Sequence, residues 1–188
     1  MLECKHGAER VSEQAVADSD DAQSPAALAR LYGALVFKAA WRVLGDAAQA
    51  EDVQQDVFLR LIQSPPAGVV SWPAWLSASA TRAAIDALRG RQRGWRLLAS
   101  WGQQQVQSAD SAEAHNIEHE RARQLRRALA NLPRREAQCF GLRYLQGLDI
   151  AQIAQALAIS ENNVNVSLHR ARQRLQTQLG DTPSEARP

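Results

Sequence analysis

The sequence predicts an all-α protein in which two small helical domains are joined by a flexible linker, and three observations support this. Apolar residues recur at helical spacing through most of the 188 residues. No stretch shows the alternating pattern that would indicate a strand. Between the two periodic parts, the segment from Gly102 to about Asn116 is rich in Gln, Ser and Ala and has no apolar period, which is typical of a linker.

The expected boundaries follow from these changes in pattern. We expect a polar, acidic tail over 1–23, a first domain over 24–96, a linker over 97–116, a second domain over 117–178 and a second tail over 179–188. The hydrophobic fraction of 45% is that of packed globular domains, so a wholly disordered chain is excluded.

The first domain is predicted to begin with two helices. Ser24 and Pro25 supply a cap and a first-turn proline for the first, which Gly45 ends. Asp46 caps the second, which stops at the segment 64–68. The expected buried stripes are Leu28, Leu31, Tyr32, Leu35, Ala39 and Val43 in the first helix, and Ala50, Val53, Val57, Phe58, Leu61 and Ile62 in the second.

The second helix carries an acidic block. Asp46, Glu51, Asp52 and Asp56 have no basic residue between them, and Gln55 and Leu59 are expected on the same outer surface. Such a surface favours a basic protein partner. The alternative is an acidic face that only meets water.

A third helix is predicted from Trp72 past Leu88, after which Gly90 and Gly94 should loosen the chain. Trp75, Leu76, Ala80, Ala84 and Leu88 are available for burial. Arginines at 82, 89, 91, 93 and 96 accompany a single acid, Asp86, and tryptophans at 72, 75, 95 and 101 are interleaved with them. Cations for phosphates and flat rings for bases are the requirements of single-stranded DNA binding. The alternative is that Trp72 and Trp75 belong to the core.

Helices are also expected over 117–130 and 134–146, followed by a helix-turn-helix from Leu148 to Leu175. Asp149 and Gln152 form a predicted capping box, Leu148 and Ile153 a hydrophobic staple, and Ser160 a cap for the last helix. Small residues at 154 and 158 would let the two helices cross closely.

The last helix has a polar face suited to DNA. Its amides can read base edges, and its arginines can hold phosphates. The candidate DNA-binding residues are Asn162, Asn163, Asn165, Val166, Ser167, His169, Arg170, Arg172 and Arg174. The alternative is an ordinary helical hairpin whose polar face is solvated.

Other classes of function find little support. Cys4 and Cys139 are isolated and the four histidines lack a metal-ligand spacing, so we expect no metal, no cofactor and no disulfide framework, as in a reducing cytoplasm. A phosphate loop, a nucleophile elbow and a catalytic triad are all missing, which argues against an enzyme. No apolar run approaches the ~18 residues of a membrane span.

Three motifs together resemble the extracytoplasmic-function (ECF) group of bacterial RNA polymerase sigma factors, over roughly residues 25–178. AEDVQQDVFLRL, from Ala50 to Leu61, resembles region 2.2, which docks on the polymerase beta-prime coiled coil. SWPAWLSASATRAAIDALRGRQR, from Ser71 to Arg93, is similar to regions 2.3 and 2.4, which open and read the minus-ten element. The segment from Ala128 to Leu175 resembles region 4, which reads the minus-35 element. The sequence as a whole also resembles the iron-uptake branch of the ECF group.

The resemblance implies a role for each matching residue. Glu51, Asp52, Gln55, Asp56, Phe58 and Leu59 would contact core polymerase or support that contact. The implied minus-ten surface consists of Trp72, Trp75, Thr81, Arg82, Asp86, Arg89, Arg91 and Arg93, and the loop from Ser64 to Val70 would lie where the family captures a flipped base. The polar face of the last helix would read the minus-35 element.

The chain also departs from the family pattern. Asn163, Asn165, Val166 and Ser167 stand where the family commonly has Thr, a basic residue, Ser and Arg, which suits contacts to adenine more than to guanine. Thr81 and Ser79 stand where Asn and a branched apolar residue are usual. Promoter sequence is therefore not transferable from a relative.

The partners implied are core RNA polymerase, through its beta-prime coiled coil and beta flap, promoter DNA, and an inhibitory anti-sigma factor, often membrane-anchored. Two other readings stay open at this point. A stand-alone helix-turn-helix regulator would bind duplex DNA without polymerase. The DNA-binding part of a recombinase or nuclease would need acids converging in one pocket, whereas the acids here lie on one outward helix.

Overall fold

The computed structural model describes residues 24–100 and 113–180, with side chains over 24–94 and 119–180, and within these residues all regular structure is helical. The elements are α2 (Pro25–Leu44), α3 (Ala47–Gln63), α4 (Trp72–Ser100), α5 (Glu113–Asn131), α6 (Arg134–Phe140), the π-helical segment η1 (Gly141–Leu145), α7 (Ile150–Leu157) and α8 (Glu161–Gly180). The all-α prediction is confirmed. None of the described helices is both long enough and apolar enough to cross a membrane.

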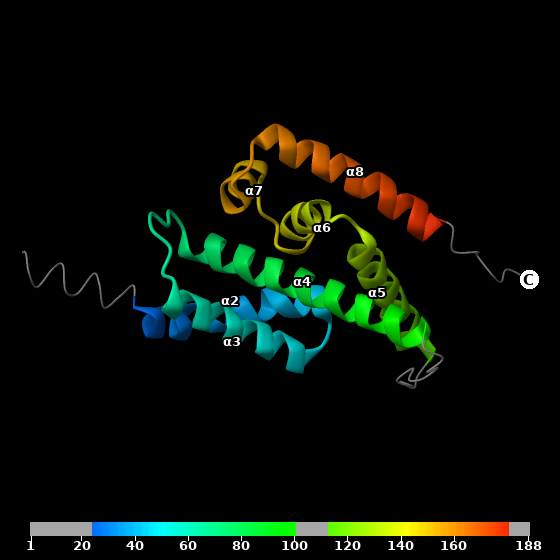
Figure 1. Ribbon diagram of the computed structural model, residues 1–188, viewed down its shortest axis with the longest axis horizontal. Coiled ribbons are helices and arrows are strands. Elements are labelled where there is room, and N and C mark those ends of the chain that lie inside the picture. The colour runs from blue at the N-terminus through cyan, green and yellow to red at the C-terminus, as the bar shows by residue number, and fades with distance from the viewer. Residues whose placement is uncertain (1–23, 101–112, 181–188) are drawn as a thin grey trace, which may run out of the picture.

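Helices α2 and α3 form an antiparallel pair, and α4 packs along it (Figure 1). The predicted caps are confirmed. The Ser24 hydroxyl accepts a hydrogen bond from the Ala27 N–H, and the Asp46 carboxylate accepts one from the Gln49 N–H. Gly45 ends α2 in the left-handed conformation, with φ of 65°, which a residue without a Cβ adopts at little cost.

The predicted buried stripes of α2 and α3 are wrong at three positions. Leu31, Leu35 and Ile62 are 69%, 37% and 61% exposed. The core-facing residue of α2 at this point is Val36 instead, which is fully buried. Helical spacing cannot distinguish these positions, because α2 carries apolar residues over more of its circumference than its two neighbouring helices cover.

Helix α4 also differs from the prediction. It runs without a break through Gly90 and Gly94 to Ser100. A glycine costs a helix only about 1 kcal/mol, which the packing of a long helix outweighs. The predicted linker thus begins within a helix, and its central residues, 101–112, lie outside the described part of the chain. The division into domains stays a prediction.

The second half of the chain folds as the helical pattern predicts. The segment predicted as one helix over 134–146 is α6 continued by η1, in which the Gln146 N–H donates to the Gly141 carbonyl oxygen at 3.2 Å. The capping box at the start of α7 is confirmed in both directions. The Gln152 N–H donates to the Asp149 carboxylate at 2.7 Å, and the Asp149 N–H donates to the Gln152 side-chain oxygen at 3.0 Å.

The turn between α7 and α8 depends on one unusual residue. Ala158 ends α7 in the left-handed conformation, with φ of 51°, and is exposed. Ala158 therefore does not line the crossing of the two helices, contrary to the prediction. Of the two small residues predicted at this crossing, Ala154 is buried and Ala158 is not. The Ser160 hydroxyl caps α8 by accepting from the Asn163 N–H at 3.3 Å, as predicted.

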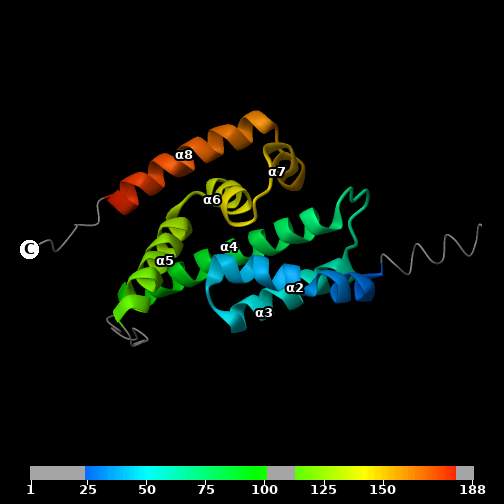
Figure 2. The same cartoon turned by 180° about the vertical axis from the view of Figure 1, so that it is seen from behind.

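The two halves share one apolar core. Figures 1 and 2 show α6 and α7 next to α4, α5 crossing the C-terminal part of α4, and α8 lying over α6 and α7. One buried cluster contains residues from both halves. Its members include Val36, Val43, Val53, Leu76, Ile85 and Leu88 from the first half and Leu129, Leu132, Ala137 and Leu175 from the second. A second cluster, mostly from α6 to α8, includes Ala78 of α4.

Candidate nucleic-acid interface

Helix α8 presents its predicted polar face to solvent. Val164, Leu168, Ala171 and Leu175 are buried on the opposite side, against the rest of the second half. The predicted DNA-binding residues that the structure places in exposed positions are Asn162, Asn163, Asn165, Val166, His169, Arg170, Arg172 and Arg174. An exposed row of amides at the N-terminal end of such a helix can reach base edges in a major groove.

Ser167 is the exception. Ser167 is buried, at 8% exposed, so it does not lie on the exposed face that carries the other predicted DNA-binding residues. It occupies the buried stripe, three residues after Val164 and four before Ala171. Helical spacing alone could have placed it there. Its side chain is hydrogen-bonded to Cys139, and burial raises the pKa of that thiol while this hydrogen bond opposes the rise.

Two arginines of α8 contact their own fold. The Arg172 Nε donates to the Tyr144 hydroxyl at 2.7 Å, and its guanidinium lies 5.5 Å from the centre of the Tyr144 ring. Arg174 pairs with the buried Glu136 of α6, with 3.1 Å between Nε and Oε2. Tyr144 in turn packs on Phe140 at 4.6 Å between ring centres. These contacts fix α8 on α6 and η1, a role that sequence did not indicate.

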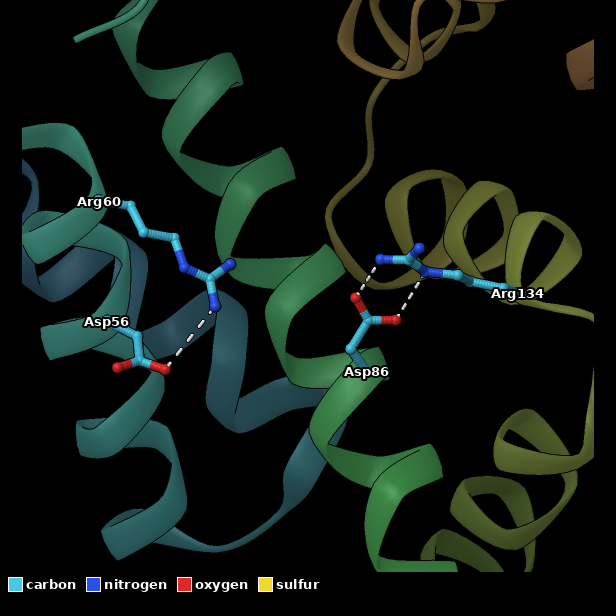
Figure 3. Close-up of polar contacts among 4 residues, drawn as sticks. All are labelled: Asp56, Arg60, Asp86 and Arg134. Atoms are coloured by element: carbon cyan, nitrogen blue, oxygen red, sulfur yellow. Dashed lines mark hydrogen bonds and ion pairs between the residues drawn. The ribbon is translucent and has the colours of Figure 1, made fainter. Parts of the chain in front are cut away.

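The second half of the chain covers part of the predicted minus-ten surface of α4. Thr81 is fully buried, and its hydroxyl has no hydrogen-bond partner. Asp86 accepts two hydrogen bonds from the Arg134 guanidinium of α6, one of them 2.8 Å from Nε to Oδ1 (Figure 3). Burial lowers the pKa of Arg82, and the charge of Arg134 lowers it further, whereas Asp86 acts in the opposite direction. The hydrogen bonds from Arg134 to Asp86 raise the pKa of Arg134.

Further along α4, the arginines differ in their surroundings. Arg89 donates to the carbonyl oxygens of Ala130, at 3.3 Å, and of Leu132. Arg91 donates to the side-chain oxygen of Gln49 at the start of α3. Arg93 is exposed. The side chains of Trp95 and Arg96, and all of Trp101, lie outside the described residues.

The two tryptophans at the start of α4 support each other. Trp72 and Trp75 meet edge to face, with 6.0 Å between ring centres, and both pack half-buried against the shared core. The structure therefore agrees with the alternative that Trp72 and Trp75 belong to the core. The neighbouring loop over 64–70, predicted to capture a flipped base, is mostly exposed, and Val70 at its end is 81% exposed.

The acidic face of α3 is exposed as predicted. Glu51, Asp52, Gln55, Asp56 and Leu59 all reach solvent, whereas Phe58 is half-buried against the core. Asp56 has one neighbour of opposite charge, Arg60, at 3.9 Å in the same helix (Figure 3). Both side chains of this pair are well exposed, so the pair contributes little to stability.

An apolar feature accompanies these acids. The exposed Leu31 and Leu35 of α2 and the exposed Leu59 and Ile62 of α3 lie toward the same end of the antiparallel pair, where α2 begins and α3 ends (Figure 1). Exposed apolar side chains on elements that also carry exposed charges are common at protein-protein contacts. Sequence periodicity hid this feature because it assigned three of the four residues to the core.

No metal centre is found among the described residues, where His, Cys, Asp and Glu side chains form no cluster of three or more.

Comparison with protein families gives two matches, in chain order. The model for sigma-70 region 2 matches residues 28–94. The model for sigma-70, region 4 matches residues 122–175. The first range contains most of α2, all of α3 and most of α4, and the second contains the helix-turn-helix.

Comparison with characterised proteins finds ECF sigma factors. The chain is 34% identical over 143 residues to the ECF RNA polymerase sigma factor SigL of Mycobacterium tuberculosis, covering 74% of this chain and 80% of SigL. It is 30% identical over 146 residues to SigK of Mycobacterium ulcerans, covering 76% and 75%. It is 28% identical over 151 residues to the probable ECF sigma factor SigI of M. tuberculosis, and there it spans about half, 52%, of the relative's length.

Solved structures with the same fold include CnrH in complex with the cytosolic domain of CnrY, with a TM-score of 0.58 and 19% identity over 90% of this chain and 96% of that one. Another is the sigma factor RpoE of Bartonella quintana in complex with the anti-sigma factor NepR, with a TM-score of 0.50 and 19% identity over 82% and 96%. At this identity, the likeness concerns the fold alone.

Proposed function

The chain belongs to the ECF sigma factors, and we propose that it acts as an alternative sigma factor, which binds core RNA polymerase and directs promoter recognition, DNA opening and transcription initiation. One observation carries the proposal. The segments matching regions 2 and 4 occur in order, each with an exposed surface of the expected chemistry: the acids of α3 and the amides of α8.

Core polymerase is proposed to dock on α3. Asp52 and Asp56 are exposed on its outer face, beside the apolar Leu59. Acids surrounding exposed apolar residues suit a partner helix that carries basic and apolar residues, such as the beta-prime coiled coil that the family resemblance implies. The apolar part supplies affinity, and the charges supply orientation and association rate.

Promoter DNA is proposed to contact two surfaces. The minus-ten surface comprises Trp72, Trp75, Thr81, Arg82, Asp86, Arg89, Arg91 and Arg93 on α4, with the loop over 64–70 beside it. The minus-35 surface comprises the exposed residues of α8, among which Asn163 and Asn165 carry the amides. Because both surfaces belong to one chain, binding of either surface to the promoter raises the effective concentration of the other there.

The test is reconstitution with core polymerase. Replacing both Asp52 and Asp56 by Lys should abolish a stable complex with core and promoter-specific initiation, because four units of charge change at the proposed contact. Since both side chains are exposed, the melting temperature should stay unchanged. Gln63→Lys, exposed at the end of the same helix, is the control and should bind normally. Normal core binding by the double variant would refute the assignment of α3.

The remaining parts of the proposal follow from this role. A sigma factor works by binding and positioning, so we propose no catalytic activity of its own, and its place is the cytoplasm, with the polymerase. We also propose an anti-sigma partner that covers these surfaces, supported by the complex of a structurally similar sigma factor with NepR. The stand-alone regulator is not favoured, because it gives no reason for the region 2 match.

Membership of the iron-uptake branch is a finer proposal that rests on the sequence resemblance alone. Transcript profiling of a deletion strain under iron limitation tests it. Loss of induction of iron-acquisition genes is the expected result, and an unchanged iron response would place the chain in another branch.

A further inference from the structure

We propose that the three arginines of α8 have different roles at the minus-35 element, and that residues of α6 and η1 assign these roles. Arg170 and Arg172 each neutralise a phosphate. The charge of Arg174 is instead offset within the protein by Glu136 of α6. Tyr144 of η1 is the positioning residue for Arg172. This inference rests on the proposed function, since that function locates the minus-35 surface on α8.

The three arginines lie on two edges of the exposed face of α8. Successive residues of a helix are rotated by about 100°, so Arg170 and Arg174, four positions apart, lie on the same edge. Arg172 lies about 200° from Arg170, on the other edge. The buried stripe of the helix runs between these edges and consists of Val164, Leu168, Ala171 and Leu175. A helix in the major groove has a sugar-phosphate backbone on each side, so each edge faces one backbone.

On the first edge, the charge of Arg174 is offset by a buried acid. Its Nε lies 3.1 Å from Oε2 of Glu136, whose side chain is 9% exposed. This oxygen has no hydrogen-bond partner among the described residues, so charge rather than a directed hydrogen bond holds the pair together. Moving Arg174 to a phosphate would leave the carboxylate buried and unpaired, which is costly. Arg174 therefore adds no net charge to the DNA surface.

Arg170 supplies the cation on this edge instead. It is exposed, and within 119–180 and the other residues whose side chains are described it forms no ion pair. It follows Asn163 by seven positions, which places the two side chains on the same edge two turns apart. A cation whose charge is not offset releases a counterion from DNA when it binds a phosphate. Arg170 can therefore neutralise a phosphate while Asn163 reaches a base edge.

On the second edge, Arg172 is held in place without loss of its charge. Its Nε donates to the Tyr144 hydroxyl at 2.7 Å, and its guanidinium lies 5.5 Å from the centre of the Tyr144 ring. A phenol carries no charge at neutral pH, so this contact does not offset the guanidinium. The hydrogen bond uses Nε, and the two terminal amino groups keep donors for a phosphate. Arg172 can therefore contact Tyr144 and DNA at the same time.

Tyr144 can position Arg172 because its own ring is fixed. The ring packs on Phe140 with 4.6 Å between ring centres, and Phe140 packs half-buried against the shared core. An arginine side chain that is already ordered loses less rotamer freedom when it binds. The aromatic pair therefore makes Arg172 a preorganised phosphate contact.

The salt dependence of promoter binding counts the neutralised phosphates. The logarithm of the binding constant falls linearly with the logarithm of the salt concentration, with a slope of about −0.9 for each phosphate. The test compares holoenzymes that contain the parent or a variant on duplex promoter DNA, between about 50 and 200 mM salt and at a temperature too low for strand opening. Arg135→Gln removes an exposed cation of α6 and is the control, which should keep the parental slope.

Glu136→Gln should release Arg174. The amide keeps the shape of the carboxylate but not its charge, so the slope should become steeper by about 0.9, and binding at low salt should tighten. Adding Arg174→Gln should remove this gain, which assigns the gain to Arg174. An unchanged slope in Glu136→Gln would overturn the role of Glu136.

The melting temperature gives a second measure of the same pair. Arg174→Gln alone should lower it, because the buried Glu136 carboxylate loses its cation, and Glu136→Gln in the same chain should restore it. If Arg174 were a phosphate contact, Arg174→Gln would make the slope shallower and leave the melting temperature unchanged. That result would overturn the offset of its charge.

Arg172→Gln should make the slope shallower by about 0.9, and Arg172→Lys, which keeps the charge, should retain the parental slope. Arg172 would only brace α8 if Arg172→Gln lowered the melting temperature and kept the parental slope, and its proposed role would then be wrong.

Tyr144→Phe keeps the ring and removes the hydroxyl. It should weaken binding about threefold, because Arg172 must then be ordered on binding, and it should leave the slope unchanged. In an Arg172→Gln background it should have no further effect. Equal weakening in both backgrounds would show that the hydroxyl does not act through Arg172, and this would overturn the positioning role.

The outcomes distinguish this inference from the proposed function. A chain that forms no complex with core polymerase would refute the proposed function, and the slopes are then measured on the same duplex with the full chain alone. A normal complex in which Glu136→Gln and Arg172→Gln both keep the parental slope would refute only the roles assigned to the arginines.

Discussion

Among the described non-glycine residues, Ala158 alone has a positive φ. The left-handed conformation brings a Cβ close to the backbone and costs roughly 1–2 kcal/mol, so glycine is the usual residue at this position after a helix. Ala158 therefore strains the turn that sets α7 against α8. The strain is tolerated because the helices on both sides are capped and packed.

Ala158→Gly should stabilise the protein by about 1 kcal/mol, since relief of this strain exceeds the added chain entropy of the unfolded state. Urea unfolding followed by circular dichroism measures the change. Ala151→Gly, at an exposed position within α7, is the control and should lower the free energy of unfolding by about 1 kcal/mol. Equal destabilisation by both substitutions would contradict the strain at 158.

The buried Ser167 and the exposed Asn165 give a second test at this scale. Ser167→Arg would force a charge beside Cys139 and should lower the free energy of unfolding by several kcal/mol. Asn165→Arg should leave stability within about 0.5 kcal/mol of the parent and change DNA binding instead. Thermal unfolding distinguishes the two variants. Equal melting temperatures would show that Ser167 lies on the exposed, DNA-facing side of α8.

At the scale of elements, α7 is a short helix whose stability depends on the hydrogen bonds at its N-terminus. Its eight residues, Ile150–Leu157, are too few to be stable as an isolated helix. The reciprocal hydrogen bonds of Asp149 and Gln152 satisfy backbone groups there, and Ile153 and Ala154 attach it to the second cluster. Cap and packing together hold the helix that supports α8.

Asp149→Ala should therefore cost about 1 kcal/mol and speed amide exchange in α7 more than elsewhere. Gln155→Ala, exposed on the same helix, is the control and should change stability by less than about 0.5 kcal/mol. Hydrogen exchange by mass spectrometry resolves α7 from its neighbours. Unchanged exchange in α7 would show that packing alone holds it.

At the scale of the whole molecule, one apolar cluster joins the two halves. Leu132 is fully buried in it, together with Val43 of α2 and Leu88 of α4. A protein with a continuous core unfolds as one unit, whereas two domains on a linker unfold separately. The shared cluster therefore makes the stability of each half depend on the other.

Leu132→Ala should cost about 2–5 kcal/mol and speed amide exchange in α2, although Leu132 lies outside the first half. Leu157→Ala is the control. Its side chain packs against the second cluster, which contains no residue of α2, so exchange in α2 should stay unchanged. Slow exchange in α2 of the Leu132 variant would indicate that the halves are independent.

The sequence determined the helices. Caps at Ser24, Asp46, Asp149 and Ser160 and the stop at Gly45 are local chemistry within a few residues, and local chemistry can be read from a chain. The acids of α3 and the amides of α8 could also be predicted as exposed, because charge and amide groups are costly to bury. The resemblance to the family rests instead on three motifs in the sequence.

The tertiary structure determined which residues of each helix are buried against another helix. The exposure of Leu31 and Ile62, the burial of Ser167 and Thr81, and the pairing of Asp86 with Arg134 all depend on which helix lies against which. The hydrogen bonds from Gln92 to Asn131 and from Arg134 to Asp86 join residues 39 and 48 positions apart, beyond the reach of any local pattern. The sequence therefore predicted which polar residues of α3 and α8 are exposed, and only the packing of the two halves showed that Thr81 and Asp86 of α4 lie against the second half.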